Sequence, residues 1–300
     1  MDEILIFGNP IAGRGQGRRI AKRLAARLSA EGYSVQTSLK RPDDLKRDEV
    51  VRPNARAAIA IGGDGTLRAV ADRLAKECAG ADCPVPPLLV VPLGTANLMG
   101  RHLGIRWDNA TMEDEIVRVL RAGKTVDLDA ARANGKLFLL MAGIGFDAHV
   151  VHELARVRTG PIRYASYLLP AALAVKDYSY PALTVSVNGK TVFRNKSGFA
   201  FVGNIAEYGT GFPILPHARS DDGLLDVCVM PCSAPTDLVH LFLKAVAGEH
   251  LTEEGVVYVK GKHVRIESAQ PVPVQLDGDS AGHTPLDIDL LPTRLSFIVP

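Results

Sequence analysis

The stretch Ala57-Ala-Ile-Ala-Ile-Gly-Gly-Asp-Gly-Thr66 decides the fold class of this chain. Its first five residues are apolar, as in a strand buried on both faces, and the glycines after them predict a tight turn. From Leu67 to about Cys78 the apolar residues recur at helical spacing. Strand, glycine turn and helix in succession predict a parallel sheet with helices on both faces.

The same unit occurs twice more in the first half of the chain. The run Glu3-Ile-Leu-Ile-Phe7 stops at Gly8-Asn9-Pro10, and a helix closed by Gly32 follows it. A second such run, from Pro87 to Val91, stops at Pro92-Leu-Gly-Thr-Ala-Asn97 before another helical stretch. One further strand is expected from Val35 to Leu39.

After about Asp127 the pattern changes to strands without long helices between them, which predicts an antiparallel β region. Asn188-Gly189 between two alternating runs is a strong hairpin signal. Helices are expected at Arg163–Val175 and Pro235–Ala247. The predicted strands are 137–141, 182–187, 191–193, 199–202, 224–230, 256–259, 263–266 and 274–276.

Composition excludes several classes of protein. The chain has 300 residues, 47% of them hydrophobic and 23% charged, which is typical of a globular protein. No apolar run approaches the roughly 20 residues of a membrane-spanning helix, and the acidic start is unlike a secretory signal. We therefore expect a cytoplasmic protein, and its four scattered cysteines are expected to be reduced thiols.

The charge distribution places a basic excess in the first half. The net charge is +2, but residues 1–128 hold 20 Lys and Arg against 16 Asp and Glu. A dedicated nucleic-acid binder would need a basic stripe with stacking aromatic residues, so we expect no nucleic-acid partner. The arginines and lysine between Arg14 and Arg27 either attract phosphate or form a solvated helix face, and the sequence leaves both readings open.

The three glycine-rich turns lie where an open α/β sheet binds ligands, and together they predict a nucleotide cradle. Asp64 adds a carboxylate that could hold a magnesium ion bridging phosphates. The P-loop pattern GxxxxGK[ST] is absent from the sequence. Arg18-Arg19 after Gly13-Arg-Gly-Gln-Gly17 departs from the dinucleotide fingerprint, and no acidic residue ends the strand at Leu39. A P-loop NTPase and a dehydrogenase are thus disfavoured.

Six motifs in order resemble the diacylglycerol kinase catalytic family, which includes soluble bacterial lipid kinases related to sphingosine and ceramide kinases. GGDGT alone is shared with NAD kinases, whereas PLGTxN and DDGLLD are more specific. The substrate loop typical of an NAD kinase is absent. The motifs are Asn9-Pro-Ile-Ala-Gly13, Gly62-Gly-Asp-Gly-Thr66, Pro92-Leu-Gly-Thr-Ala-Asn97, Gly143-Ile-Gly-Phe-Asp147, Asp221-Asp-Gly-Leu-Leu-Asp226 and Asp277-Gly-Asp279.

The resemblance implies an α/β domain of residues 1–127 completed by a last strand within 292–300. It also implies an antiparallel β-sandwich of residues 128–291, with ATP in the cleft between the two domains. Asp222, with the carbonyls of Arg219 and Leu224, would hold a structural magnesium ion. The residues expected around ATP are Asn9, Pro10, Ile11, Ala12, Gly13, Arg14, Arg19, Ser38, Gly62, Gly63, Asp64, Gly65, Thr66, Leu67, Thr95 and Asn97.

The candidate catalytic residues are Asp279, Asp64 and Asp277. Transfer of a phosphoryl group to an alcohol needs a proton acceptor and cationic charge at the phosphate. The family motif is usually DGE, so the resemblance puts Asp279 at the position of the glutamate base with one methylene less. Asp277 or a bridging water is expected to compensate for the shorter reach. Taken alone, Asp277-Gly-Asp279 also reads as a hairpin turn.

The sequence therefore predicts a magnesium-dependent ATP:lipid kinase with a diacylglycerol-like acceptor. Two alternatives stay open: a kinase of a soluble substrate such as NAD, and a regulatory protein that binds nucleotide without transferring phosphate. Peripheral contact with the membrane is expected through Arg156, Arg158, Arg163 and the apolar run Tyr164–Val175, which could equally be a core helix. A homodimer also stays open.

Overall fold

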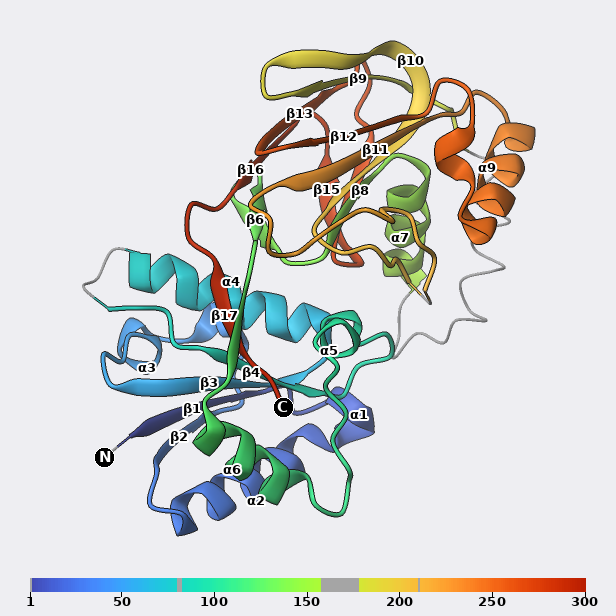
Figure 1. The fold of residues 1–300 in the computed structure, drawn as a ribbon. Coiled ribbons are helices and arrows are strands. Elements are labelled where there is room, and N and C mark those ends of the chain that lie inside the picture. The colour runs from blue at the N-terminus through green and yellow to red at the C-terminus, as the bar shows by residue number, and fades with distance from the viewer. Residues whose placement is uncertain (1, 80–82, 158–177, 210) are drawn as a thin grey trace. The chain divides into compact units, whose positions relative to one another are not determined.

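A computed structural model of the protein describes residues 2–79, 83–157, 178–209 and 211–300. Contacts divide the chain into two compact units. We call Met1–Leu128 with Arg294–Pro300 the α/β unit, and Asp129–Thr293 the sandwich unit. The helix expected at Arg163–Val175 lies outside the described residues. Most of the described helices and strands are labelled in Figure 1.

The α/β unit contains a six-stranded sheet in the order β2-β1-β3-β4-β17-β5. The first four strands are parallel, and β17, from the C-terminus of the chain, lies between β4 and β5 (Figure 1). The strands are β1 (Glu3–Gly8), β2 (Ser34–Ser38), β3 (Ala55–Gly62), β4 (Leu88–Pro92), β5 (Thr125–Leu128) and β17 (Leu295–Ile298).

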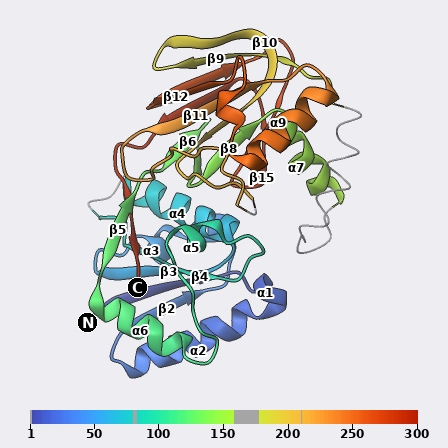
Figure 2. The same ribbon diagram turned by 45° about the vertical axis from the view of Figure 1, so that its right-hand side comes forward.

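Helices cover both faces of this sheet. In Figures 1 and 2, α2 and α6 lie together on one face and α4 lies on the other. Ile20, Leu24 and Leu28 of α2 recur at helical spacing and are all buried, as the sequence predicted. The helices are α1 (Ala12–Gly15), α2 (Gly17–Ala30), α3 (Arg47–Val50), α4 (Asp64–Ala79), α5 (Leu98–His102) and α6 (Met112–Ala122), with a 3₁₀ turn η1 at Pro42–Asp44.

The sandwich unit is built on antiparallel strands joined through one long strand, β10 (Lys190–Gly203). The N-terminal part of β10 pairs with β9, and its C-terminal part pairs with β8 and β11. The other elements are β6 (Ala131–Ala133), β7 (Lys136–Phe138), β8 (Met141–Ile144), α7 (Phe146–Val157), β9 (Ala182–Val187), β11 (Leu225–Pro231), α9 (Pro235–Ala247), η2 (His250–Thr252), β12 (Val257–Gly261), β13 (His263–Glu267), β14 (Pro273–Leu276), β15 (Asp279–His283) and β16 (Leu286–Leu290).

Two strand predictions need correction. The strands expected at 191–193 and 199–202 are parts of one strand, β10. Two strands were predicted because polar residues at 194–196 interrupt the apolar pattern, at the point where the pairing with β9 shifts register. The strand expected at 137–141 is two strands, β7 and β8. The predicted fold class, a mostly parallel α/β unit and an antiparallel β unit, is confirmed.

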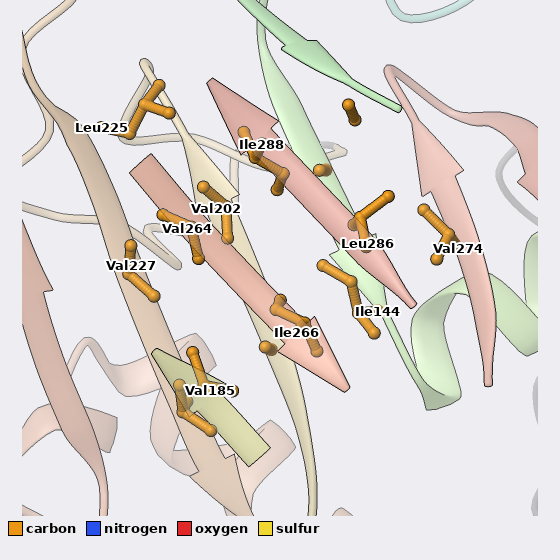
Figure 3. Close-up of a cluster of buried hydrophobic side chains, with 14 of the residues drawn as sticks. Ile144, Val185, Val202, Leu225, Val227, Val264, Ile266, Val274, Leu286 and Ile288 are labelled. Carbon is orange, nitrogen blue, oxygen red and sulfur yellow. The ribbon is translucent and has the colours of Figure 1, made fainter. Parts of the chain in front are cut away.

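The core of the sandwich unit is a cluster of buried, mostly aliphatic side chains contributed by most of its strands. Figure 3 shows residues of β8, β9, β10, β11, β13, β14 and β16 directed into one cluster, in which Val202, Val264 and Ile288 are fully buried. Within the described part of the chain, no helix is both long and apolar enough to cross a membrane. All four cysteines are free and buried.

Candidate active site

The predicted nucleotide loops start at neighbouring strand ends in the α/β unit. In the parallel register Phe7 lies opposite Ser38, Gly8 opposite Ile61, and Gly62 opposite Pro92. The loops after β1, β3 and β4 therefore leave the same edge of the sheet. The structure thus brings three of the motifs together where an open α/β sheet binds its ligands.

Glycine is required where the loops after β3 and β4 touch. A Cβ on Gly94 would lie 2.7 Å from the Cα of Gly63, and one on Gly62 would lie 2.5 Å from Thr66 Oγ1. A side chain on Gly94 would force the backbones of the two loops apart, and one on Gly62 would collide with the Thr66 side chain. The glycines of GGDGT and PLGTAN thus serve first to let the two loops pack directly against each other.

The carboxylate of Asp64 anchors the loop after β4. Its Oδ2 accepts a hydrogen bond from the Leu98 N–H at 2.9 Å, and its Oδ1 accepts one from the Met99 N–H at 3.0 Å. Burial raises the pKa of Asp64, and these backbone N–H groups partly oppose that rise. The contacts of Asp64 are those of a residue that positions the start of α5, and its predicted metal role stays a prediction.

Two asparagines fold the loops themselves. Asn9 Oδ1 accepts the N–H of Ile11 at 3.1 Å, while Asn9 Nδ2 donates to Thr66 Oγ1 at 3.4 Å. Asn97 has a left-handed backbone and accepts the Gly94 N–H at 2.7 Å. Asn9 and Asn97 therefore shape the predicted cradle, and their contact with a nucleotide stays a prediction.

The loop after β1 exposes cationic side chains. Gly13 and Arg14 both have left-handed backbones, with φ of 58° and 59°. Arg14 and Arg19 are exposed, as phosphate-binding groups of an open loop would be, and Ile11 is 78% exposed. Gly17 admits no side chain, because a Cβ there would lie 2.0 Å from the carbonyl oxygen of Asn9.

Three of the predicted nucleotide residues have different environments. Leu67 is 1% exposed and its N–H donates to the Gly63 carbonyl oxygen, so both its side chain and its amide are occupied within the fold. Ser38 is buried at the end of β2, where its Oγ accepts the Lys40 N–H at 3.4 Å. Thr95, in contrast, is exposed on the loop after β4.

The candidate base lies on a tight hairpin of the sandwich unit. Leu276 pairs with Asp279, and the two residues between them, Asp277 and Gly278, have φ of 51° and 84°. Positive φ at both central residues is the pattern of a type I′ turn. The hairpin reading of Asp277-Gly-Asp279 is therefore right, and Asp279 is the half-buried first residue of β15.

The Asp277 carboxylate is used to hold this hairpin. It accepts the backbone N–H groups of Leu139, Leu140 and Met141 at 2.9, 2.9 and 3.0 Å. Three such donors are the arrangement of a carboxylate that positions the hairpin and with it Asp279, and the catalytic role predicted for Asp277 stays a prediction. The role of Asp279 as base stays a prediction.

A second support of the hairpin was missed in the sequence. Gln275 is fully buried, and its Oε1 accepts the Gly278 N–H at 2.7 Å. A Cβ on Gly143 would lie 2.6 Å from Gln275 Nε2 and 2.3 Å from Asp147 Oδ2, so both groups pack onto this glycine. The spacing Gly143-Ile-Gly-Phe-Asp147 was the signal for this contact, but nothing local to it indicated Gln275.

Asp147 is a strongly perturbed carboxyl group. Tyr208 Oη donates a 2.6 Å hydrogen bond to its Oδ1, and burial raises the pKa of Asp147 to about 6. A cavity of about 560 Å³ opens in the same unit, lined in part by His149, His152 and Ser280. Ser280 follows Asp279, so this cavity borders the strand of the candidate base.

Asp222 was expected to hold a structural magnesium ion together with the carbonyl oxygens of Arg219 and Leu224, and its carboxylate is paired with a lysine. Asp222 Oδ2 lies 2.8 Å from Lys260 Nζ, and Asp222 Oδ1 accepts the N–H of Leu224 at 3.1 Å. Leu224 thus presents its amide to Asp222, and the nearest cation is an ammonium. Mg²⁺ needs a near-octahedral oxygen shell, and this arrangement does not fit it. Among the described residues, no group of three or more His, Cys, Asp or Glu side chains could hold a metal ion.

Comparisons with known proteins agree with this architecture. The model of the diacylglycerol kinase catalytic domain matches residues 3–133, and that of the YegS C-terminal NAD kinase beta sandwich-like domain matches residues 140–299. Diacylglycerol kinases of Staphylococcus aureus (strain bovine RF122 / ET3-1) and Staphylococcus carnosus (strain TM300) are 28% and 26% identical to this chain. Each match covers 98% of this chain and 91% or 94% of the relative.

Solved structures give the same result. A crystal structure of a diacylglycerol kinase from Bacillus anthracis str. Sterne is similar with a TM-score of 0.72 and 26% identity, over 100% of this chain and 97% of that one. An NAD kinase from Archaeoglobus fulgidus, solved in complex with ATP, shares the fold alone, with a TM-score of 0.54 and 13% identity over 99% of this chain and 93% of that one. The matched domains together span almost the whole sequence, and the chain belongs to the diacylglycerol kinase family.

Proposed function

We propose that this kinase transfers the γ-phosphoryl group of ATP to the hydroxyl of a diacylglycerol-like lipid. The observation that carries the proposal is the match, over 98% of the chain, to relatives named diacylglycerol kinase. The loops of the α/β unit favour nucleotide binding, because glycines let the loops after β3 and β4 pack together and because Arg14 and Arg19 are exposed.

In the proposed reaction the lipid hydroxyl oxygen attacks the γ-phosphorus, and the bond to the β–γ bridging oxygen breaks to release ADP. Asp279 accepts the hydroxyl proton, and Asp277 with Gln275 keeps the hairpin in place for that transfer. Arg14 and Arg19 bind phosphate oxygens. Mg²⁺ bound with ATP supplies further charge neutralisation at the phosphates.

The proposed acceptor is a membrane lipid, and helix α9 offers a surface for reaching it. Val239, Phe242, Leu243 and Val246 are 56%, 52%, 61% and 51% exposed, and their spacing puts them on one face of the helix. We propose that these four residues, the α9 stripe, rest on the lipid surface. The basic stretch first considered for this contact lies largely outside the described residues.

A lipid surface fits the α9 stripe better than a second copy of the chain does. Four half-exposed side chains on one helix present well under the roughly 800 Å² per partner that stable protein interfaces bury. Near the stripe, Lys244 is paired with Glu249 and Glu253, and His240 Nε2 lies within hydrogen-bonding distance of Glu253. Contact through this stripe is therefore expected to be apolar and insensitive to salt.

The docking proposal is tested with Leu243→Ser/Val246→Ser, and exposed Thr236→Ser on the same helix is the control. The affinity of the double variant for phosphatidylcholine vesicles, measured by co-sedimentation, should fall at least about tenfold, because two aliphatic side chains are no longer buried in the lipid. Phosphorylation of a short-chain, water-soluble diacylglycerol should stay unchanged. Equal vesicle binding by all three proteins would contradict the docking role and leave the kinase proposal standing.

A further inference from the structure

The loop Asp221-Asp-Gly-Leu-Leu-Asp226 carries two carboxylates that share one lysine. Lys260 lies directly across from Asp226 in the pairing of β11 with β12. Its Nζ is 2.8 Å from Asp222 Oδ2, 3.2 Å from Asp226 Oδ2 and 3.1 Å from the carbonyl oxygen of His217. An ammonium has three donors, and three oxygens surround this one.

Burial makes a cation at this place necessary. The Asp226 side chain is 0% exposed, and a desolvated carboxylate is costly unless a positive charge or hydrogen bonds compensate it. Tyr258 Oη donates to Asp226 Oδ1 at 2.6 Å, and Lys260 supplies the charge on the other side. The Lys260 side chain is 29% exposed. Its aliphatic part extends from β12 to the carboxylates of Asp222 and Asp226.

The lysine and a magnesium ion would compete for one oxygen. Mg²⁺ binds carboxylate oxygen at about 2.0–2.1 Å, and Lys260 Nζ already lies 2.8 Å from Asp222 Oδ2. A magnesium ion and the Lys260 ammonium, both bound to Asp222 Oδ2, would lie close enough to repel each other strongly. Leu224 also directs its N–H toward the Asp222 carboxylate.

We propose that the Lys260 ammonium is the built-in cation of this loop and takes the place of a structural magnesium ion. The sandwich unit then folds without a divalent metal. The magnesium requirement of the proposed kinase reduces to the ion that accompanies ATP. A cation at this loop affects the stability of the folded chain, so its role is tested independently of which lipid is the acceptor.

The test uses thermal unfolding of the full chain without nucleotide, in EDTA and in millimolar MgCl₂. The midpoint of the unmodified chain should agree between the two conditions within about 1 °C, because no site in the folded state gains the ion. Lys260→Met should unfold at a clearly lower temperature in EDTA, while Lys262→Met, at an exposed lysine two residues away, should not. Lys260→Arg keeps the positive charge and should unfold at the same temperature as the unmodified chain. This comparison serves as the test if Lys260→Met does not fold.

Direct binding of Mn²⁺, followed by electron paramagnetic resonance, completes the test. The nucleotide-free chain should show no tight site. One Mn²⁺ per chain that disappears in Asp222→Asn would overturn the proposal. Magnesium-dependent stabilisation of the unmodified chain, or a Lys260→Met variant as stable as Lys262→Met, would overturn it equally.

Discussion

Replacing Asp277 and Asp279 separately should distinguish the residue that supports the hairpin from the residue that acts in phosphoryl transfer. Asp277→Asn keeps the shape of the side chain, but it puts an amide where a carboxylate accepts three backbone N–H groups at 2.9–3.0 Å. At least one of those bonds is lost, and an NH₂ group then faces an N–H donor. Asp279→Asn removes a proton acceptor and disturbs none of these bonds.

The magnitude follows from the charged hydrogen bonds. Each is worth about 1.5–3 kcal/mol, and allowing for partial exposure and shared contributions we expect Asp277→Asn to cost about 2–4 kcal/mol of stability. That corresponds to a fall in the unfolding midpoint of roughly 5–15 °C for a unit of this size. Asp279→Asn should shift the midpoint less than Asp277→Asn does and reduce kcat at least about 100-fold.

The assay pairs thermal unfolding with phosphoryl transfer from γ-labelled ATP, run on both variants at a temperature where both are folded. Asp277→Asn should retain part of the activity, since Asp279 is still present. If Asp277→Asn were as stable as the unmodified chain, the three hydrogen bonds would not hold the hairpin. Near-normal turnover in Asp279→Asn would remove Asp279 as the base.

Two further predictions concern the loops and the pH dependence. In Gly94→Ala the new Cβ would lie 2.7 Å from Gly63 Cα, so this variant should lose about 1–3 kcal/mol of stability and bind ATP more weakly in calorimetry. Gly100→Ala, with only 3.4 Å contacts, should change neither stability nor ATP binding. Equal effects of the two substitutions would refute the close approach of the loops. Burial raises the pKa of Asp147 from 3.8 to about 6, so the folded state binds more protons than the unfolded chain in that window. Stability should then fall as pH rises from about 4 to 6, by up to about 3 kcal/mol. Asp147→Asn should flatten that slope in urea titrations, and an unchanged slope would contradict the assignment.

The α/β unit was largely predictable because its strands are apolar and its loops glycine-rich. Both signals are local: the run Ala57–Ile61 reads as a buried strand, and Ile20, Leu24 and Leu28 mark the inner face of α2. What the sequence did not show was the use of the loop residues. Asp64 was interpreted as a metal ligand, and its visible partners are backbone N–H groups 34 and 35 residues away.

The sandwich unit was less predictable because its pairing is long-range. The strand Asp279–His283 carries no apolar alternation, and it is a strand only because it pairs with Pro273–Leu276 across the turn. Lys260 shows the same limit for the site, since it reaches Asp222 across 38 positions of sequence. Motif order identified the family, while side-chain roles depended on tertiary contacts.

The proposed function is tested most directly by phosphoryl transfer by the purified chain from γ-labelled ATP, with dispersed diacylglycerol and with NAD as alternative acceptors. Transfer to a diacylglycerol-like lipid predicts a labelled lipid product that requires Asp279, and no labelled dinucleotide. A labelled dinucleotide, or ATP binding without any product across a panel of lipids, would contradict it.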